Sequence, residues 1–229
     1  DISFNLRRGE ILGVAGLVGS GRSNVAEAIF GVVPATSGQI LVDGKSVQVT
    51  SPSVAMSLGM GFLTEDRKEA GLLLDKNLPV NLTHSALDMW GFRIDTTREK
   101  AEMTRARKDF DIRAASDDMR AGALSGGNQQ KLLLAKTMLT EPEIVIIDEP
   151  TRGIDIGTKQ QIYHFVRELA RQGKAVIVIS SELPEVIGLS DRVLVMRMGT
   201  IAGEVDGAAI TEENIVRLAM GLEREEEPA

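Results

Sequence analysis

The chain contains no cysteine and few aromatic residues. Without a thiol it can form neither a disulfide framework nor a thiol-based active site, which is compatible with a reducing compartment. Aromatic residues make up 3% of the chain, so we expect Trp90 and Phe92 to pack in a small core rather than to stack on a ligand. His84 and His164, the two histidines, are expected to be ordinary helix residues.

The chain also has fewer basic than acidic residues, and it has no long apolar run. Lysine and arginine number 26 against 33 aspartate and glutamate residues, and the net charge of −7 argues against a nucleic-acid partner. No apolar run approaches the length that crosses a bilayer, and no signal-peptide pattern opens the chain, so any role at a membrane would be peripheral. The 229 residues suffice for one α/β domain, with or without a subdomain.

The chain does contain a serine-glycine-glycine motif shortly before a predicted buried strand. LSGGNQQK spans residues 124–131 and leads into an apolar segment, 131–139, that we expect to be helical. Backbone N–H groups at a helix start carry partial positive charge, and glycine lets a phosphate approach them closely. The motif therefore predicts an anion site; the alternative is a flexible glycine turn before a core helix.

The strand that follows ends in two adjacent carboxylates. Residues 144–147, IVII, show no alternation of apolar and polar side chains, which is typical of a parallel strand buried on both faces. Asp148 and Glu149 lie at its carboxyl end, where open α/β sheets bind their ligands. We expect Asp148 to hold Mg²⁺ and Glu149 to orient a water, because a shared cation removes the repulsion between them. The alternative, two solvated carboxylates, is disfavoured because Pro150 and Thr151 turn the chain back at once.

A glycine-rich loop near residue 20 supplies a second phosphate-binding pattern. GLVGSGRS, residues 16–23, lies between a predicted strand and a predicted helix over 24–30, as the phosphate loop GxxxxGK[ST] requires. Its N–H groups can wrap a β-phosphate, and the hydroxyl of Ser23 can reach Mg²⁺. The predicted nucleotide-binding residues of this loop are Gly16, Leu17, Val18, Gly19, Ser20, Gly21, Arg22, Ser23 and Asn24.

Arginine stands at position 22, where the phosphate-loop pattern has lysine. It keeps the positive charge but replaces a compact ammonium with a planar fork of different reach. A charge pair at about 4 Å is worth about 4 kcal/mol at an effective dielectric of about 20, so the retained charge favours retained binding. Catalytic geometry is less tolerant, and we expect weak or absent turnover of the nucleotide that this loop binds.

The remaining segments predict an α/β fold with a parallel-sheet core, an antiparallel side sheet and a helical insertion. Residues 1–16 predict two strands joined by a turn at 7–9, and because the first begins at residue 1 we expect a fragment of a longer polypeptide. A hairpin turning at Asp43 and Gly44 is expected over 38–49. The other expected core elements are helices at 51–58, 157–171 and 211–220 and strands at 59–64, 174–179, 193–196 and 201–205.

Residues 66–123 contain no strand-like run and predict a helical subdomain inserted between two core strands. One helix is expected to begin at residue 77, and another, with a capping box at 96–99, to run to about residue 110. The expected domain therefore covers residues 1–220, with its core in 1–65 and 124–220. An acidic tail at 221–229 has little to bury and is expected to be disordered.

The motifs occur in the order GLVGSGRS, LSGGNQQK, IVIIDEPTRGID and ISSE, and over nearly its whole length the chain resembles the nucleotide-binding domain of ABC transporters. It is also similar to the carboxy-terminal half of the tandem ATPase subunit of bacterial ribose, galactose and xylose importers. GLVGSGRS with its arginine, FLTEDRKEAGLL, and DEPTRGID followed by ISSELPEV carry that narrower resemblance. It implies a P-loop NTPase fold of the RecA-like type, ATP and Mg²⁺ as ligands, and ATP-driven import of a monosaccharide or related polyol.

The resemblance implies a role for each motif. Residues 16–24 would be the Walker A loop, Asp148 the Walker B carboxylate and Glu149 the base or water-orienting residue. Asp155 would lie at a dimer interface. The signature residues, which would contact the γ-phosphate of the nucleotide bound by the opposite domain, are Ser125, Gly126, Gly127, Asn128 and Gln129.

Two positions depart from the general pattern of that family. Glu65 stands where a glutamine usually contacts Mg²⁺ and the attacking water, and a carboxylate facing triphosphate is unfavourable unless a metal lies between them. Ser181 stands where a histidine usually reaches the γ-phosphate. With Arg22, these residues predict an asymmetric pair of sites, in which the partner's site hydrolyses ATP and this one mostly holds nucleotide.

The resemblance implies partners and a location. They are an amino-terminal ABC domain of the same polypeptide or a second copy, arranged head to tail, permease subunits docked near residues 65–81, and indirectly a periplasmic sugar-binding protein. The location would be the cytoplasmic face of the bacterial inner membrane. One alternative is a regulatory module without catalysis, which Arg22, Glu65 and Ser181 favour and Glu149 opposes. Another is a soluble ABC protein acting on DNA or ribosomes, which the acidic balance opposes.

Overall fold

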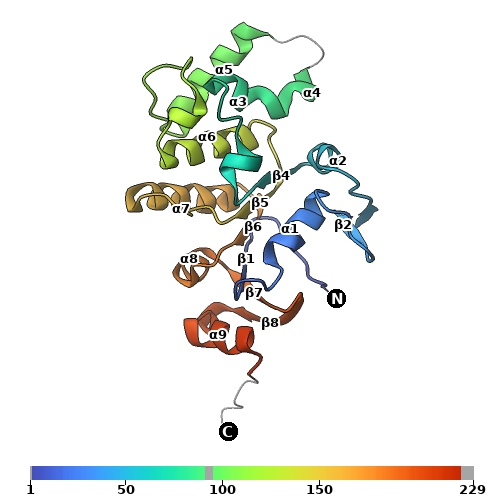
Figure 1. The fold of residues 1–229 in the computed structure, drawn as a ribbon. Coiled ribbons are helices and arrows are strands. Elements are labelled where there is room, and N and C mark those ends of the chain that lie inside the picture. Colours follow the sequence, from blue (N-terminus) through green and yellow to red (C-terminus); the bar gives the residue numbers. More distant parts are fainter. Residues whose placement is uncertain (1, 91–94, 223–229) are drawn as a thin grey trace.

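The computed structural model describes residues 2–90 and 95–222, in which a six-stranded sheet lies at the centre. Helices cover both faces of this sheet, with α1 and α7 on opposite sides (Figure 1). The strand order is β4-β5-β6-β1-β7-β8, and only β8, at one edge, runs antiparallel to its neighbour. The strands of this sheet are β1 (Ile11–Gly16), β4 (Met60–Leu63), β5 (Ile144–Asp148), β6 (Ala175–Ile179), β7 (Arg192–Arg197) and β8 (Thr200–Asp206).

The central strands are apolar on both faces because helices cover both. β5 and β6 pair in parallel, with Asp148 opposite Ile179 at their carboxyl ends, and the apolar residues Val145–Ile147 and Ala175–Ile179 are buried. This confirms the buried parallel strand expected at 144–147. β1 lies on the other side of β6, so the ends of these three strands meet at one edge of the sheet, where α/β folds place their ligands.

A separate hairpin forms the side sheet. β2 (Ile40–Val42) and β3 (Lys45–Val47) pair antiparallel, and the turn residues Asp43 and Gly44 both have positive φ, 48° and 76°. A two-residue turn with two left-handed positions matches the twist of the strands, and glycine tolerates it best. The predicted hairpin is confirmed.

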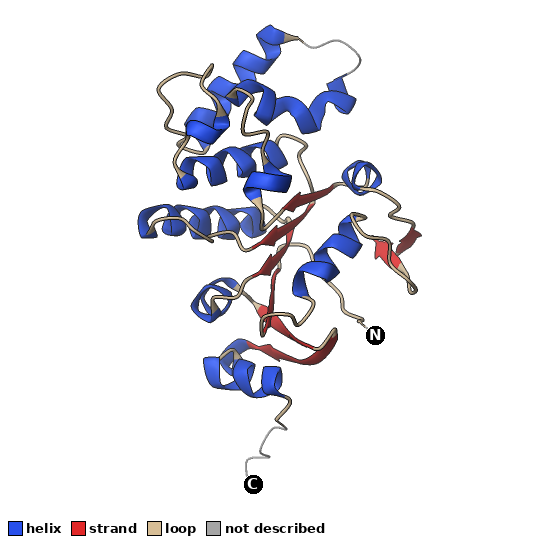
Figure 2. Ribbon diagram, in the orientation of Figure 1, coloured by secondary structure: helices blue, strands red, loops and turns tan. Residues whose placement is uncertain are grey.

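The helices bring the signature motif and the insertion into one apolar core. Between β4 and α6 lie a single π-helical turn, Arg67–Gly71, and the helices α3 to α5 (Figure 2). Leu78, Leu82 and Met103 of this segment pack into the same buried cluster as Leu132 of α6. The helices are α1 (Arg22–Phe30), α2 (Pro52–Ser57), α3 (Leu78–Thr83), α4 (Leu87–Trp90), α5 (Thr96–Asp109), α6 (Gly126–Met138), α7 (Ile156–Arg171), α8 (Leu183–Leu189) and α9 (Glu212–Met220).

The division into a core and a helical subdomain at residues 66 and 123 stays a prediction. Trp90 is half-buried and carries the Arg98 guanidinium 3.9 Å from its ring centre, whereas Phe92 and residues 223–229 of the tail lie outside the described residues. Both histidines are exposed helical residues. None of the described helices combines the length and the apolar character that crossing a bilayer requires.

Two local predictions were wrong, and one helix was not predicted. Residues 2–6 form no strand; Ile2, Phe4 and Leu6 pack on the core without ladder partners. Asp95, not residue 96, caps α5 by accepting from the amides of residues 97 and 98, while Glu99 turns inward to the Thr83 hydroxyl at 2.8 Å. The helix α8 was not expected, because its short apolar stretch directly follows the end of a strand.

Candidate functional site

The phosphate loop connects β1 to α1 at the carboxyl edge of the sheet. Gly19 and Gly21 have φ of 80° and 94°, and Gly21 stands at the amino terminus of α1. Such left-handed positions are readily adopted only by glycine, so the sequence of the loop follows from its turn. The Gly199 amide donates to the Ser20 carbonyl at 2.9 Å and ties the loop to the turn between β7 and β8.

Asp148 is a buried carboxylate with one free oxygen. It is 2% exposed, and its Oδ1 has no hydrogen-bond partner among the described residues. Burial raises the pKa of Asp148 to about 6, while a hydrogen bond from Ser23 opposes the rise. A carboxylate oxygen without a partner, beside a serine hydroxyl, fits Mg²⁺, which takes one or two protein ligands and completes its shell with waters and phosphates.

A metal bound at Asp148 would depend on such outside ligands. Within residues 2–90 and 95–222, no group of three or more histidine, aspartate or glutamate side chains is arranged to hold an ion.

Glu149 is held by the end of β6. Its φ of 48° is uncommon for a residue with a side chain. Its Oε1 accepts from the Ser181 amide at 2.7 Å, and its Oε2 accepts from the Ser181 hydroxyl at 3.1 Å. The structure therefore brings Glu149 and Ser181 together, with the serine orienting the carboxylate.

Arg22 points into the same cluster. Its guanidinium donates to the Ser180 carbonyl at 2.6 Å and lies 3.9 Å from Glu149 Oε1. The side chains of Arg22 and Glu149 are each only 10% exposed, so their attraction is weakly screened. The cation of the phosphate loop is thus directed toward Glu149 and the end of β6.

Glu65 forms an ion pair with the Arg152 side chain. In this structure the carboxylate that follows β4 is therefore neutralised by an arginine. Arg152 directly follows the Asp-Glu-Pro-Thr motif, and sequence analysis assigned it no role.

The signature motif forms the exposed tip of α6. Ser125 is exposed and caps the helix by accepting from the Asn128 amide at 3.4 Å and from the Asn128 side-chain amide at 2.9 Å. Asn128 in turn accepts from the Arg113 amide at 2.7 Å, whereas Gln129 is buried. The tip therefore presents a serine and the first turn of a helix to solvent, as an anion site at a surface requires.

The tip of α6 packs closely on the start of α7. A Cβ at Gly127 would lie 2.7 Å from the Thr158 hydroxyl, so this contact depends on glycine. Asp155 caps α7 by accepting from the Thr158 amide and hydroxyl, both at 2.9 Å, and these hydrogen bonds lower its pKa. Asp155 thus fixes the loop beside the signature tip.

Two clusters of predicted site residues form, whereas Glu65 pairs with Arg152 and Leu17 and Val18 are exposed. Arg22 and Ser23 of the phosphate loop gather with Asp148, Glu149 and Ser181 at the ends of β5 and β6. The signature residues gather with Asp155 at the tip of α6, and residues 149–155 connect the two clusters.

Arg67 contacts the second cluster, and sequence analysis missed it. Its guanidinium lies against Gly126, Gln129 and the backbone of residues 152–153. In the sequence it belongs to FLTEDRKEAGLL, one of the stretches that carry the family resemblance, and to a charged run directly after a strand, but neither indicates its contacts.

Solved structures of ATP-binding cassettes share this fold. The dimeric post-hydrolysis state of the cassette MJ0796, bound to ADP and Pi, matches with a TM-score of 0.78 at 18% identity, over 90% of this chain and 89% of that one. The cassette MJ1267 of an ABC transporter matches with a TM-score of 0.79 at 21% identity, over 95% of this chain and 90% of that one. They confirm the predicted fold class.

Sequence comparison extends the likeness. The ribose import ATP-binding protein RbsA 2 of Escherichia coli O157:H7 is 51% identical over 225 residues, which cover 96% of this chain and 44% of that protein. A putative ribose/galactose/methyl galactoside import ATP-binding protein of Burkholderia lata is 51% identical over 223 residues, covering 96% and 42%. The chain thus spans less than half the length of these curated relatives.

A family model described as ABC transporter matches residues 1–152, from the start of the chain through the Asp-Glu strand end. With the two site clusters and the shared cassette fold, this match confirms the resemblance that the motifs carry. The chain therefore belongs to the ABC transporter family.

Proposed function

We propose that the chain is the ATP-binding domain that powers import of a monosaccharide or related polyol through an ABC transporter. It lends its signature tip to a partner domain, while its own phosphate loop mostly holds nucleotide. The observation that carries this proposal is the contrast between the two clusters: Ser125 is exposed on α6, whereas Arg22 is tied to Ser180 and Glu149. The import activities named for the relatives support the substrate class.

The proposed partners follow the same arrangement. An amino-terminal ABC domain of the same polypeptide, or a second copy, would bind head to tail, so that Ser125, Gly126 and Asp155 face the nucleotide on the opposite phosphate loop. The relatives are more than twice as long as this chain, which leaves room for such a domain within one polypeptide. The assembly would sit on permease subunits at the cytoplasmic face of the inner membrane, with a periplasmic sugar-binding protein as an indirect partner.

The nucleotide ligands of this chain's own site would be held by its first cluster. The glycine loop would wrap the phosphates, and Ser23 and Asp148 would hold Mg²⁺, which supplies charge neutralisation between the phosphate oxygens. Glu149 would orient a water while Ser181 fixes its carboxylate. Glu65, paired with Arg152, would reach the metal only by exchanging that partner.

Turnover at this site is expected to be weak because of Arg22. In a full subunit whose partner phosphate loop is inactivated, Arg22→Lys is expected to raise the residual ATP hydrolysis several-fold, since a lysine ammonium restores a compact charge for the phosphates. Arg22→Ala, the matched control, removes the charge and should lower nucleotide binding instead. A large loss of an already high rate on Arg22→Lys would contradict the proposal.

A non-catalytic regulatory module is the second candidate, and the Arg22 contacts favour it for the local site. Unlike the first candidate, it does not require the signature residues to contact a nucleotide bound by a partner domain. Retained hydrolysis by the full subunit after alteration of the signature tip would support it.

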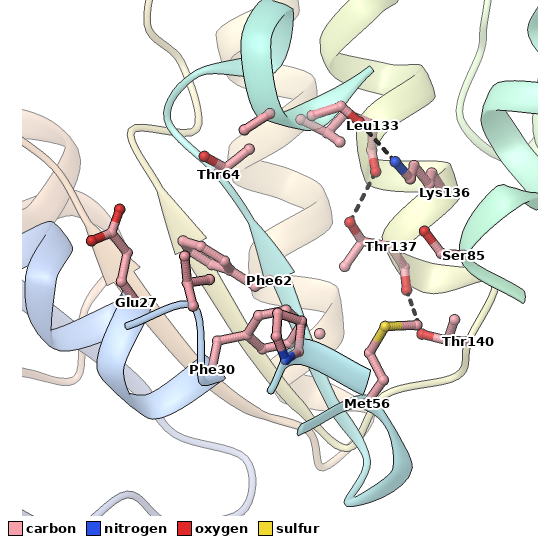
Figure 3. Close-up of a pocket in the computed structure, with 15 residues that line it drawn as sticks. Glu27, Phe30, Met56, Phe62, Thr64, Ser85, Leu133, Lys136, Thr137 and Thr140 are labelled. Atoms are coloured by element: carbon pink, nitrogen blue, oxygen red, sulfur yellow. Dashed lines mark hydrogen bonds between the residues drawn. The ribbon is translucent and has the colours of Figure 1, made fainter. Parts of the chain in front are cut away.

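A groove beside β4 is the proposed docking surface for the permease. A cavity of about 290 Å³ lies between α1 and α2 on one side and α6 on the other, and Ala70 and Gly71 of the predicted docking segment line it together with Thr64 just before that segment. Figure 3 shows Phe30 and Phe62 on one side, Thr137 of α6 and Thr140 just after that helix on the other, and Met56 between them in this view. An apolar wall facing a row of hydroxyl groups suits an amphipathic segment of a cytoplasmic loop.

A charge placed in this groove is expected to weaken assembly. Met56→Glu should reduce binding to the detergent-solubilised permease at least about tenfold, because an unpaired carboxylate would lie against the apolar wall. Leu41→Glu is the matched control, since Leu41 is 53% exposed on β2, outside the groove. Binding can be measured by pull-down. Permease binding to a chain that lacks residues 66–123 would place the docking surface elsewhere.

A further inference from the structure

We infer that Arg67 is a positioning residue that holds the signature tip to the loop after Asp148 and Glu149, so that both meet the opposite nucleotide as one surface. The inference rests on the proposed function of the tip. It assigns to a residue outside the phosphate loop, the signature motif and the Asp-Glu strand end the task of setting the relative position of the last two.

The contacts of the Arg67 guanidinium reach both elements. Its Nε donates to the Gln129 side-chain oxygen of α6 at 3.3 Å. Its Nη1 donates to the Arg152 carbonyl at 2.8 Å, and its Nη2 to the Gly153 carbonyl at 3.4 Å. Arginine suits this task because a rigid fork of donors can bond three acceptors at once, which a single ammonium on a flexible stem cannot do in the same geometry.

Gln129 connects Arg67 to the backbone just before the signature serine. Its side-chain nitrogen donates to the carbonyls of Ala121 and Leu124, each at 3.3 Å, and Leu124 immediately precedes Ser125. Gly126 lies against the same guanidinium, since a Cβ there would be 3.0 Å from Arg67 Nη2 and 3.1 Å from the Gly153 carbonyl. Arg67 therefore binds the tip of α6 through Gln129 and lies against its first turn at Gly126.

A second link joins the same two segments. The carboxylate of Glu65 pairs with the Arg152 side chain while Arg67 binds the Arg152 carbonyl, so residues 65–67 and 152–153 are connected twice. Asp66, between them, accepts from the amides of Lys68 and Glu69 at 3.0 Å each and fixes the π-helical turn that begins at Arg67. The backbone at Arg67 is therefore well determined.

The turn also borders the groove beside β4. Ala70 and Gly71, at the end of the π-helical turn, line that cavity, while the side chain of Arg67 reaches the α6 tip. Helical turns of this rare type are frequent at functional sites. A displacement of the groove wall would therefore move the group that sets the position of the tip.

The test uses the full subunit with Arg67→Ala, Arg67→Lys and the matched control Lys68→Ala, an exposed cation one residue along. We expect both Arg67 variants to lower kcat for ATP hydrolysis about 10- to 100-fold, because a misplaced contact acts on the transferred phosphate. The KM for ATP and the affinity of this chain's own loop for nucleotide should stay near the wild-type values, and Lys68→Ala should keep the wild-type rate.

Thermal unfolding, measured on the same samples, separates positioning from loss of fold. A fall in kcat with an unchanged unfolding temperature supports the inference, and Arg67→Lys decides if Arg67→Ala does not fold. Wild-type kcat in a folded Arg67 variant would overturn it. Gly126→Val separates the inference about Arg67 from the proposed function of the signature tip. If Gly126→Val abolishes ATP hydrolysis while the Arg67 variants retain it, only the inference about Arg67 fails. If the Gly126 and Arg67 variants all retain hydrolysis, the proposed function fails as well.

Discussion

Under the proposed function, replacing Gly126 with valine is expected to lower ATP hydrolysis by the full-length protein about 100-fold or more. The loss of a preorganised donor to a reacting anion costs about that much. A side chain at this position would occupy the approach to the first turn of α6 and would collide with the Arg67 guanidinium and the Gly153 carbonyl, 3.0 and 3.1 Å from the new Cβ. Steady-state ATP hydrolysis in the presence of the proposed permease and binding protein measures the effect.

The matched control for this experiment is Gly188→Ala. Gly188 lies in α8, is exposed, and a Cβ there would meet nothing within 4 Å. It should leave hydrolysis and stability near the wild-type values. Hydrolysis that persists unchanged in the folded Gly126→Val subunit would end the proposal that this chain lends its tip to another domain.

Exchanging Asp148 for asparagine is expected to stabilise the protein without nucleotide while removing its response to Mg²⁺ and ATP. Burial raises the pKa of Asp148 from 3.8 to about 6. The ionised carboxylate is therefore less stable in the folded than in the unfolded protein, which lowers the free energy of unfolding at any pH where Asp148 is ionised. The penalty is absent below pH 3.8, grows between pH 3.8 and 6, and is complete above about pH 6. At pH 8 the variant should gain about 1 to 3 kcal/mol in free energy of unfolding.

Denaturant unfolding at pH 8 and at pH 4 measures this gain, which should shrink toward the lower pH. Added ATP and Mg²⁺ should raise the unfolding temperature of the wild type but not of Asp148→Asn. Asp118→Asn changes an exposed carboxylate and should alter neither quantity. A variant that is less stable at pH 8 than the wild type, or that keeps the Mg²⁺-dependent shift, contradicts this assignment.

The sequence predicted those features that arise within short segments. The buried strands β5 and β6, the glycine turn of the phosphate loop and the capped tip of α6 each follow from a run of a few residues with a clear physical preference. The family resemblance then related these segments to one another. Fold class and family were therefore within reach of the sequence.

Contacts between segments that are distant in the sequence could not be predicted in this way. Arg67 binds residues 62, 85 and 86 positions away along the chain, and no periodicity or motif indicates which carbonyls a guanidinium will meet. The pairing of Glu65 with Arg152 and the contact of Arg22 with the Ser180 carbonyl are of the same kind. Residues 2–6 show the converse, because their alternation suited a strand, whereas Ile2, Phe4 and Leu6 pack on the core without a ladder partner.

Because Arg22 lies close to Glu149, nucleotide binding at this loop would replace one anionic partner of Arg22 with another. The guanidinium already has a negative partner 3.9 Å away, so an arriving phosphate must compete with a group of the same sign. The measured affinity would then be a difference between two ion pairs. A nucleotide that wins this competition would also separate Glu149 from its cationic partner.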